Sequence, residues 1–312
     1  SLIYLEYKKN KKFSLLNFYQ KRIRRLVPAL LVVIFLTSFA AYSFLLPYHF
    51  KEYIYSVIYS FFFSSNIYFY FSCQAYGANI LSIKPLLHTW SLGIEEQFYL
   101  FFPIFFILVA KFFFKKLNYF LIFIFLSSFI FSLLIENSHQ SFNFYMISSR
   151  AWELIGGGIL AIYHIKKKKK LNVNSNYQKI FTKIGLALII FSFLMFKDAG
   201  SLRIYYTIIP VIGCCLIINY NYKNDLIIKI LSSKPFVSIG LISYSLYLWH
   251  HPILSFDKIL GISKGDIFIK INLILLSILL AYLTYKFVET PFRKQNFYSG
   301  KKLILTTFCL LP

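Results

Sequence analysis

Two adjacent carboxylates stand at the edge of a strongly apolar run, in the stretch HTWSLGIEEQFYLFFP that begins at His88. Glu95 and Glu96 follow a histidine, a tryptophan and a serine, and the run from Phe98 onward is almost entirely apolar. An ionised carboxylate at the centre of a membrane costs at least about 2.5–3.5 kcal/mol, so acids there usually have a polar partner or a function. Because imidazole and carboxylate groups carry out general acid–base chemistry, His88, Glu95 and Glu96 are the catalytic candidates.

A simpler explanation of the two glutamates depends on where their helix begins. If it begins near Ser91, both acids lie in or near the first turn, where the helix dipole favours anions. They would then be interfacial, with one acid facing the bundle interior and the other the lipid headgroups.

Polar residues gather at two further helix ends that are predicted to share the same side of the membrane. Arg150 and Glu153 open one apolar run, and His250 and His251 close another. Arg150 and Glu153 are three residues apart and could simply pair on a helix. Three such ends together indicate a polar pocket, for which the substrate-binding candidates are Trp90, Ser91, Arg150, Glu153 and His250.

A pair of arginines precedes the first long apolar run. Arg22 and Arg25 are three apart and share a helix face, and guanidinium groups bind phosphate oxygens in a bidentate fashion. The alternative is that they are ordinary basic residues at a cytoplasmic helix end, where they attract anionic lipid.

Apolar stretches of membrane-spanning length recur along the 312 residues, which are 58% hydrophobic and only 14% charged. A soluble domain is nearer to half apolar and a quarter charged, so the pattern predicts an all-α, polytopic transmembrane helical bundle. About nine to ten apolar segments are expected, at 26–46, 53–72, 92–110, 117–135, 150–165, 180–196, 203–219, 236–254, 267–288 and from 302.

The net charge of +23 comes from basic clusters between the apolar runs. The positive-inside rule explains these clusters, so no nucleic-acid partner is expected. If each segment from 92 onward crosses the membrane in turn, every basic loop lies in the cytoplasm. If segment 53–72 also crossed, however, the basic loop at 111–116 would lie outside. We therefore predict that 53–72 is an interfacial or re-entrant piece on the outer side.

The cysteines and glycines suggest no separate site. The four cysteines form no CxxC pair, so neither a metal site nor a disulfide framework is expected. The glycines at 156–158 fit close helix packing through small residues. The opening and closing phrases of the chain suggest a segment of a longer protein.

Five phrases in order resemble the bacterial acyltransferase family 3 of integral membrane O-acyltransferases, over roughly residues 1–295. These phrases are FYQKRIRRLVPAL, KPLLHTWSLGIEEQFYLFFP, SRAWELIGGGILA, IGLISYSLYLWHHPIL and YKFVETPFRK. The resemblance implies transfer of an acyl group, most often acetyl, from cytoplasmic acyl-CoA to a hydroxyl of an envelope carbohydrate such as lipopolysaccharide O-antigen or peptidoglycan. It also implies a multi-pass protein of the bacterial inner (cytoplasmic) membrane, in contact with lipid.

The resemblance also assigns roles to residues. It associates Arg22 and Arg25 with binding of the acyl-CoA donor, most often acetyl-CoA, and matches Glu289 and Arg293 to a terminal supporting motif. One departure is the absence of the family's first two helices, of which the first carries the histidine thought to be catalytic. That histidine is therefore expected upstream of Ser1, with His88 in a supporting role.

The same departure shapes the expected domains. Residues 1–295 would form the transmembrane domain without its first two helices, and 296–312 would begin an extra helix. Ten helices plus one are expected in the full-length protein, and in a subfamily the last leads to an extracytoplasmic SGNH-type domain. Two other functions stay open: a proton-coupled transporter or flippase of envelope lipids or sugars, and an inactive scaffold for a C-terminal hydrolase domain.

Overall fold

The computed structural model describes residues 2–10, 12–74, 83–166, 175–195, 204–221 and 224–294. These residues are mostly helical, and the described ranges contain no strand, which confirms the all-α prediction. The chain divides into two compact units. Unit 1 comprises Ser1–Phe13 and Ile94–Ser238, and unit 2 comprises Ser14–Gly93 and Ile239–Pro312.

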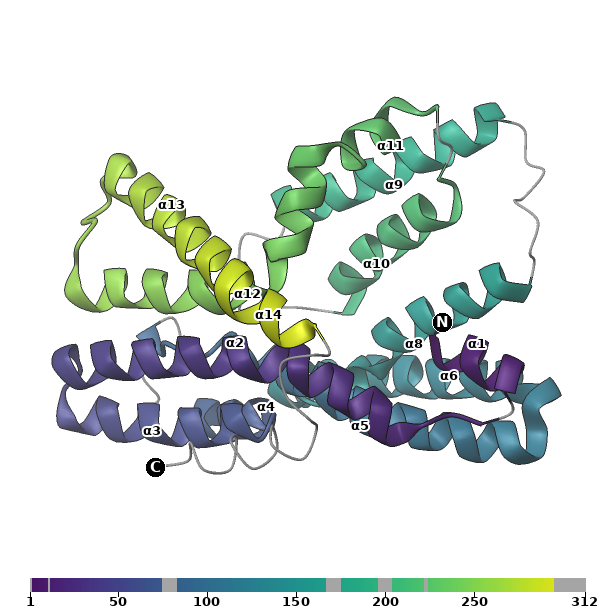
Figure 1. The fold of residues 1–312 in the computed structure, drawn as a ribbon, viewed down its shortest axis with the longest axis horizontal. Helices are drawn as coiled ribbons and strands as arrows, with labels where there is room; N and C mark the ends of the chain where they lie inside the picture. The colour runs from purple at the N-terminus through teal and green to yellow at the C-terminus, as the bar shows by residue number, and fades with distance from the viewer. Residues whose placement is uncertain are drawn as a thin grey trace. The chain divides into compact units, whose positions relative to one another are not determined.

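The helices follow one another along the chain as labelled in Figure 1. They are α1 (Leu2–Asn10), α2 (Leu15–Phe44), α3 (Pro47–Phe61), α4 (Ser65–Gln74), α5 (Thr89–Phe113), the 3₁₀ turn η2 (Phe114–Lys116), α6 (Leu117–Ile135), α7 (Gln140–Tyr145), α8 (Ile147–Lys166), α9 (Ser175–Met195), α10 (Ile204–Asn219), α11 (Leu226–Leu231), α12 (Lys234–Leu260), α13 (Ile267–Thr284), the π-helical turn η4 (Tyr285–Glu289) and α14 (Thr290–Arg293).

The long helix α2 organises unit 2. Ser14 caps its first turn by accepting a hydrogen bond from the Asn17 amide at 3.3 Å, which satisfies one of the free donors of a helix N-terminus. One face of α2 is buried in the core of the unit through Ala29, Leu30, Val33, Ile34 and Ala41. The opposite face leaves large aromatic side chains such as Phe35 exposed, as expected of a helix that faces lipid.

Segment 53–72 is a broken helix that folds back on itself. It contains most of α3 and α4, and Phe63 in the turn between them has a positive φ of 52°. Tyr68 on α4 donates a hydrogen bond to the carbonyl of Glu52 on α3 at 3.0 Å, and its ring stacks on Tyr59. Helices of 15 and 10 residues are each shorter than the roughly 20 residues that span a bilayer. The folded-back shape suits a re-entrant piece, and its side of the membrane stays a prediction.

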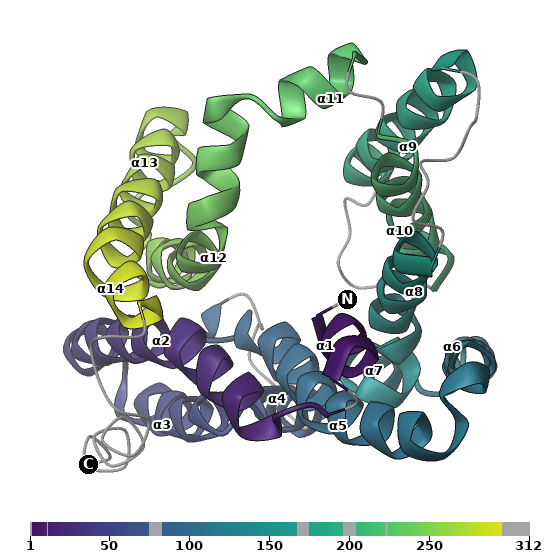
Figure 2. The ribbon, with the colours of Figure 1, turned by 45° about the vertical axis from the view of Figure 1, so that its right-hand side comes forward.

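The later part of α12 runs beside α2 in the same direction, as both Figure 1 and Figure 2 show. In the first half of α2, the hydroxyl of Tyr244 donates to the Leu26 carbonyl at 2.8 Å. Near its end, the rings of Phe44 and Phe256 lie 6.5 Å apart. The indole of Trp249 holds α12 to α13 by donating to the Thr284 hydroxyl at 2.9 Å. Positions along α12 therefore map onto positions along α2.

Unit 1 is built from helix pairs. Helices α9 and α10 cross where Gly185 meets Gly213, so closely that a Cβ on either glycine would lie 2.8 Å from the other's carbonyl oxygen. Small residues permit this approach. The predicted close packing at 156–158 is wrong for Gly157 and Gly158, because a Cβ on either would meet nothing within 4 Å. The packing role belongs to Gly185 and Gly213 instead.

The number of membrane spans is confirmed only in part. Length and composition mark four candidate spans within the described ranges: Leu15–Phe44, Thr89–Ile135, Asn176–Met195 and Ile267–Arg293. The first, third and fourth contain or largely overlap one predicted segment each, and the second contains two that α5 and α6 form separately. The predicted total of nine to ten segments is not confirmed, and the segment from 302 lies outside the described residues.

Candidate functional site

A tight turn before α5 places His88 inside unit 2. The amide of Thr89 bonds to the Leu86 carbonyl at 3.0 Å, and the hydroxyls of Thr89 and Ser60 lie 2.8 Å apart. Gly93 allows the start of α5 to press against the α3–α4 turn, since a Cβ there would lie 2.9 Å from the amide oxygen of Asn66. These contacts fix the position of His88 relative to α3 and α4.

His88 belongs to a cluster of three histidines. Its ring stacks on His251 with centroids 5.1 Å apart, and meets His250 edge-on at 5.5 Å and Tyr247 at 5.0 Å. The partners come from one face of α12, because positions 247, 250 and 251 are spaced i, i+3 and i+4. We call His88, Tyr247, His250 and His251 the histidine cluster.

The hydrogen bonds of the cluster define which nitrogens can accept a proton. The Nδ1 of His250 lies 2.6 Å from the Tyr247 carbonyl oxygen, and the Nδ1 of His251 lies 3.2 Å from the Pro85 carbonyl oxygen. A carbonyl only accepts, so Nδ1 carries the proton in both rings. In the neutral form of either ring, Nε2 is then the basic atom.

His88 differs from its two neighbours because it is buried without a hydrogen bond. Only 7% of the residue is exposed, and neither ring nitrogen has a hydrogen-bond partner within the described ranges. Burial is the main cause that lowers the pKa of His88 well below its usual value of 6.5, with His251 and His250 as smaller causes; a contact with the Leu248 backbone, outside hydrogen-bond geometry, opposes them. The ring is therefore neutral at physiological pH, with one donor and one acceptor nitrogen.

Tyr247 ties the cluster to the first turn of α5. Its hydroxyl donates a short hydrogen bond to the His88 carbonyl and lies 2.8 Å from the Ser91 hydroxyl. Since a phenol has one proton to donate, Ser91 donates to Tyr247. The sequence prediction grouped His88, Ser91 and His250, and the structure brings these three together. Trp90 is half-buried in the same turn.

The placement of Glu95 and Glu96 corrects the prediction that both lie in or near the first turn of their helix. Helix α5 begins at Thr89, two residues before the expected start, so its first turn holds no acid. Glu95 is the seventh residue of α5 and is exposed, whereas Glu96 is half-buried. The dipole effect falls off within the first turn, so it does not account for these acids.

A second polar group lies at the other end of α12. Glu289 is only 1% exposed, and it accepts a hydrogen bond from the Ser245 hydroxyl at 3.2 Å and pairs with Arg293 at 3.4 Å. It also interacts electrostatically with Arg25. The carboxylate is presented by the π-helical turn η4, a feature frequent at functional sites. Arg25 is exposed and Arg22 half-buried on α2, so this basic end carries more positive than negative charge.

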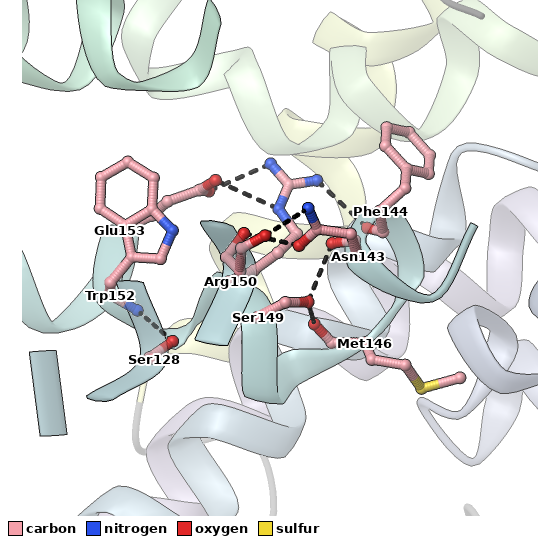
Figure 3. Close-up of polar contacts among 9 residues, drawn as sticks. Ser128, Asn143, Phe144, Met146, Ser149, Arg150, Trp152 and Glu153 are labelled. Carbon is pink, nitrogen blue, oxygen red and sulfur yellow. Dashed lines mark hydrogen bonds and ion pairs between the residues drawn. The ribbon is translucent and has the colours of Figure 1, made fainter. Parts of the chain in front are cut away.

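Arg150 and Glu153 form a bidentate ion pair within unit 1 (Figure 3). The Nε and Nη2 atoms of Arg150 lie 3.3 and 3.0 Å from the two carboxylate oxygens, which confirms that they pair on one helix. The α7–α8 junction supports them, because Ser149 donates to the Asn143 carbonyl at 2.9 Å and Arg150 reaches the Phe144 carbonyl at 3.5 Å. A substrate role for this pair stays a prediction.

Three polar groups thus follow one another along α12. Ser245 contacts the basic end, His250 and His251 form the middle, and Lys258 lies near the C-terminus of the helix. At 1.5 Å per residue, the 13 residues from Ser245 to Lys258 span about 20 Å. Within the described ranges, no group of three or more His, Cys, Asp or Glu residues could hold a metal ion.

Comparison with known proteins gives one consistent result. An acyltransferase domain, that of acyltransferase family 3, matches residues 2–286. The chain is 34% identical to O-acetyltransferase OatA of Staphylococcus aureus over 319 residues, which cover 95% of this chain and 50% of that protein. It is 30% identical to peptidoglycan O-acetyltransferase OatA of Listeria monocytogenes, covering 95% and 49%. The chain thus spans about half the length of these relatives, and no solved structure matches it significantly.

Proposed function

We propose, because the chain belongs to acyltransferase family 3, that it forms the membrane part of an O-acetyltransferase of the bacterial cytoplasmic membrane. The donor is cytoplasmic acetyl-CoA, and the acceptor is a hydroxyl of an envelope carbohydrate. The observation that carries the proposal is the domain match over residues 2–286 together with relatives named O-acetyltransferase. One of them is named for peptidoglycan, which makes peptidoglycan the first acceptor to test.

The basic end suits the phosphates of the donor. Arg22 and Arg25 share a face of α2. Arg293 adds a third guanidinium, and 43% of the Arg293 side chain is exposed. Glu289 pairs with Arg293 and interacts electrostatically with Arg25, so a buried carboxylate holds the Arg293 guanidinium in place near Arg25. Arginine forks match phosphate oxygens in geometry and charge. We assign donor binding to Arg22 and Arg25, with Glu289 as a positioning residue.

The chemistry is acyl transfer from a thioester to an alcohol. The acceptor oxygen attacks the acyl carbonyl carbon, the new C–O bond forms, the C–S bond breaks, and the thiolate leaves and is protonated. The hydroxyl proton passes to an imidazole base. We assign the histidine cluster to orienting the acceptor hydroxyl through the Nε2 lone pairs of His250 and His251. Glu95 or Glu96 would orient the base.

Labelled acetyl-CoA tests this proposal in the full-length protein. Replacing both Arg22→Ala and Arg25→Ala should raise the KM for acetyl-CoA at least about tenfold per lost charged contact. Lys21→Ala removes an exposed positive charge from the same turn and should leave the KM unchanged. Intact donor affinity in the double variant would refute the donor assignment. Movement of glycan across the membrane without any acylation would favour a transporter or flippase instead.

A further inference from the structure

A cavity of about 390 Å³ lies in unit 2, at the C-terminal ends of α2 and α12. Its walls come from the α2–α3 junction, α3, the segment before His88 and the last turns of α12. Small-molecule sites usually measure about 300–1,000 Å³ and combine apolar walls with a few convergent polar groups. The cavity fits that description, with Phe44 and Tyr53 among its walls and His49, Glu52, Lys84 and Lys258 as its charged or titratable lining.

The polar lining of the cavity is held in a fixed arrangement. Lys84 is 7% exposed, and its Nζ lies 3.6 Å from one carboxylate oxygen of Glu52 and 3.2 Å from the Ser72 hydroxyl. The other oxygen of Glu52 lies 3.7 Å from the Nδ1 of His49. A buried ammonium needs such partners. Glu52 therefore balances the charge of Lys84, with its own position fixed from both sides.

Lys258 gives the cavity its net positive charge. It is exposed, and it has no carboxylate within ion-pair distance among the described residues. The neighbouring Asp257 is turned to Ser263, whose amide and hydroxyl lie 2.8 and 2.9 Å from its carboxylate oxygens. With Lys84 neutralised by Glu52, one ammonium is left to attract an anion.

The cavity borders the histidine cluster. Pro85 lines the cavity and accepts the hydrogen bond from the Nδ1 of His251, and the ring of His88 stacks on His251. Lys258 is also close enough to His251 to interact with it electrostatically. A molecule in the cavity would thus be separated from His88 only by Pro85 and His251. Within the described part of the chain, His88 is the only buried histidine whose ring nitrogens lack a hydrogen bond.

We infer that this lysine cavity is the acceptor site, and that it takes a sugar bearing a carboxylate. The carboxylate of the sugar lies toward Lys258 and Lys84. Glu52 accepts a hydrogen bond from a ring hydroxyl of the sugar, and His49 donates one to another ring hydroxyl. This assignment rests on the proposed function, because it names the acceptor class of the acetyl transfer. It also gives a role to the lysines of the cavity, because acetyl transfer to a neutral glycan would need no ammonium group.

Two readouts on the full-length protein in nanodiscs test the inference. The probes are a glycan with free carboxylates and the same glycan with its carboxylates amidated. We expect the free-carboxylate glycan to bind at least about tenfold more tightly, as for one charged hydrogen bond. Lys258→Glu should abolish this preference, whereas Lys51→Glu, which reverses an exposed charge on α3 outside the cavity, should preserve it.

Binding and transfer then separate the two proposals. Equal binding of both glycans by the unmodified protein, or a preference that survives Lys258→Glu, would overturn the acceptor site even if acetyl transfer occurs. A carboxylate preference that Lys258→Glu removes, in a protein that transfers no acetyl group to either glycan, would uphold the sugar site and refute the O-acetyltransferase function. Because Lys258 is exposed, its replacement should not prevent folding. As a second variant, Glu52→Gln leaves the charge of Lys84 unbalanced and should increase the preference for the free-carboxylate glycan.

Discussion

Replacing Tyr247 with phenylalanine removes one oxygen that holds the histidine cluster together. The hydroxyl donates to the His88 carbonyl and accepts from Ser91 at 2.8 Å, and the phenyl ring still fills the space between them. Each hydrogen bond contributes about 0.5–1.5 kcal/mol net. Tyr247→Phe should therefore lower the free energy of unfolding by about 1–3 kcal/mol. Ser91→Ala loses only one of the two bonds and should cost about 0.5–1.5 kcal/mol.

A double-mutant cycle isolates the contact. Once Tyr247 is phenylalanine, Ser91→Ala has no bond left to break, so the two changes should be non-additive by about 1 kcal/mol. Unfolding by sodium dodecyl sulfate in mixed micelles measures each value. Tyr119→Phe, at a residue that is 73% exposed, should change stability by less than about 0.5 kcal/mol. Additive effects within about 0.3–0.5 kcal/mol would refute the geometry of the cluster.

Three further predictions concern the remaining parts of the structure. Burial lowers the pKa of His88 below 6.5, so below about pH 6.5 the unfolded chain binds a proton at this histidine that the folded chain does not bind. The free energy of unfolding should therefore decrease as the pH is lowered below about 6.5, and it should decrease less steeply in His88→Phe. Glu289→Gln should raise the KM for acetyl-CoA several-fold with a smaller effect on kcat, because it releases Arg293 and not a reacting group. Gly213→Ala forces apart the crossing at Gly185 and should cost about 1–3 kcal/mol of stability.

Each of these has a matched control. Gly157→Ala adds the same methyl group where nothing lies within 4 Å, and equal losses in both glycine variants would contradict the crossing. His139→Phe replaces an exposed histidine, and an unchanged pH dependence in His88→Phe would contradict the assignment to His88. Glu289→Asp keeps the negative charge, so its KM for acetyl-CoA should lie closer to that of the unmodified protein than the KM of Glu289→Gln does. Equal KM values in the two variants would indicate that Glu289 has a packing role alone.

Local sequence patterns predicted the helices well because apolar runs of this length leave few alternatives. Helix α6 covers residues 117–135 as expected, and α13 begins at the predicted residue, Ile267. The α5 start was predicted two residues late, at Ser91, because the turn around Thr89 depends on Ser60, 29 residues earlier. Contacts of that range are invisible to a local pattern, and the error gave Glu95 a dipole explanation that the structure removes.

The candidate site could be predicted only where its residues lie on one helix face or match a family phrase. His250 was singled out as a polar residue that closes an apolar run and also lies in a family phrase. The i, i+3 spacing from Tyr247 to His250 would have pointed to Tyr247 as well, but it was not used. The lysine cavity could not have been predicted, since His49, Lys84 and Lys258 come from separate segments that only the fold brings together. His49 lies in α3 and lines this cavity.

The sidedness of the reaction shows whether donor and acceptor bind at opposite faces of the membrane. The full-length protein would be reconstituted in oriented vesicles, with labelled acetyl-CoA added only at the face of the basic end and glycan only at the opposite face. We expect base-labile labelled ester on the glycan, and we expect it to be lost when Arg22 and Arg25 are both alanine. Absence of ester in this arrangement, together with ester formation when donor and glycan share one face, would contradict this expectation.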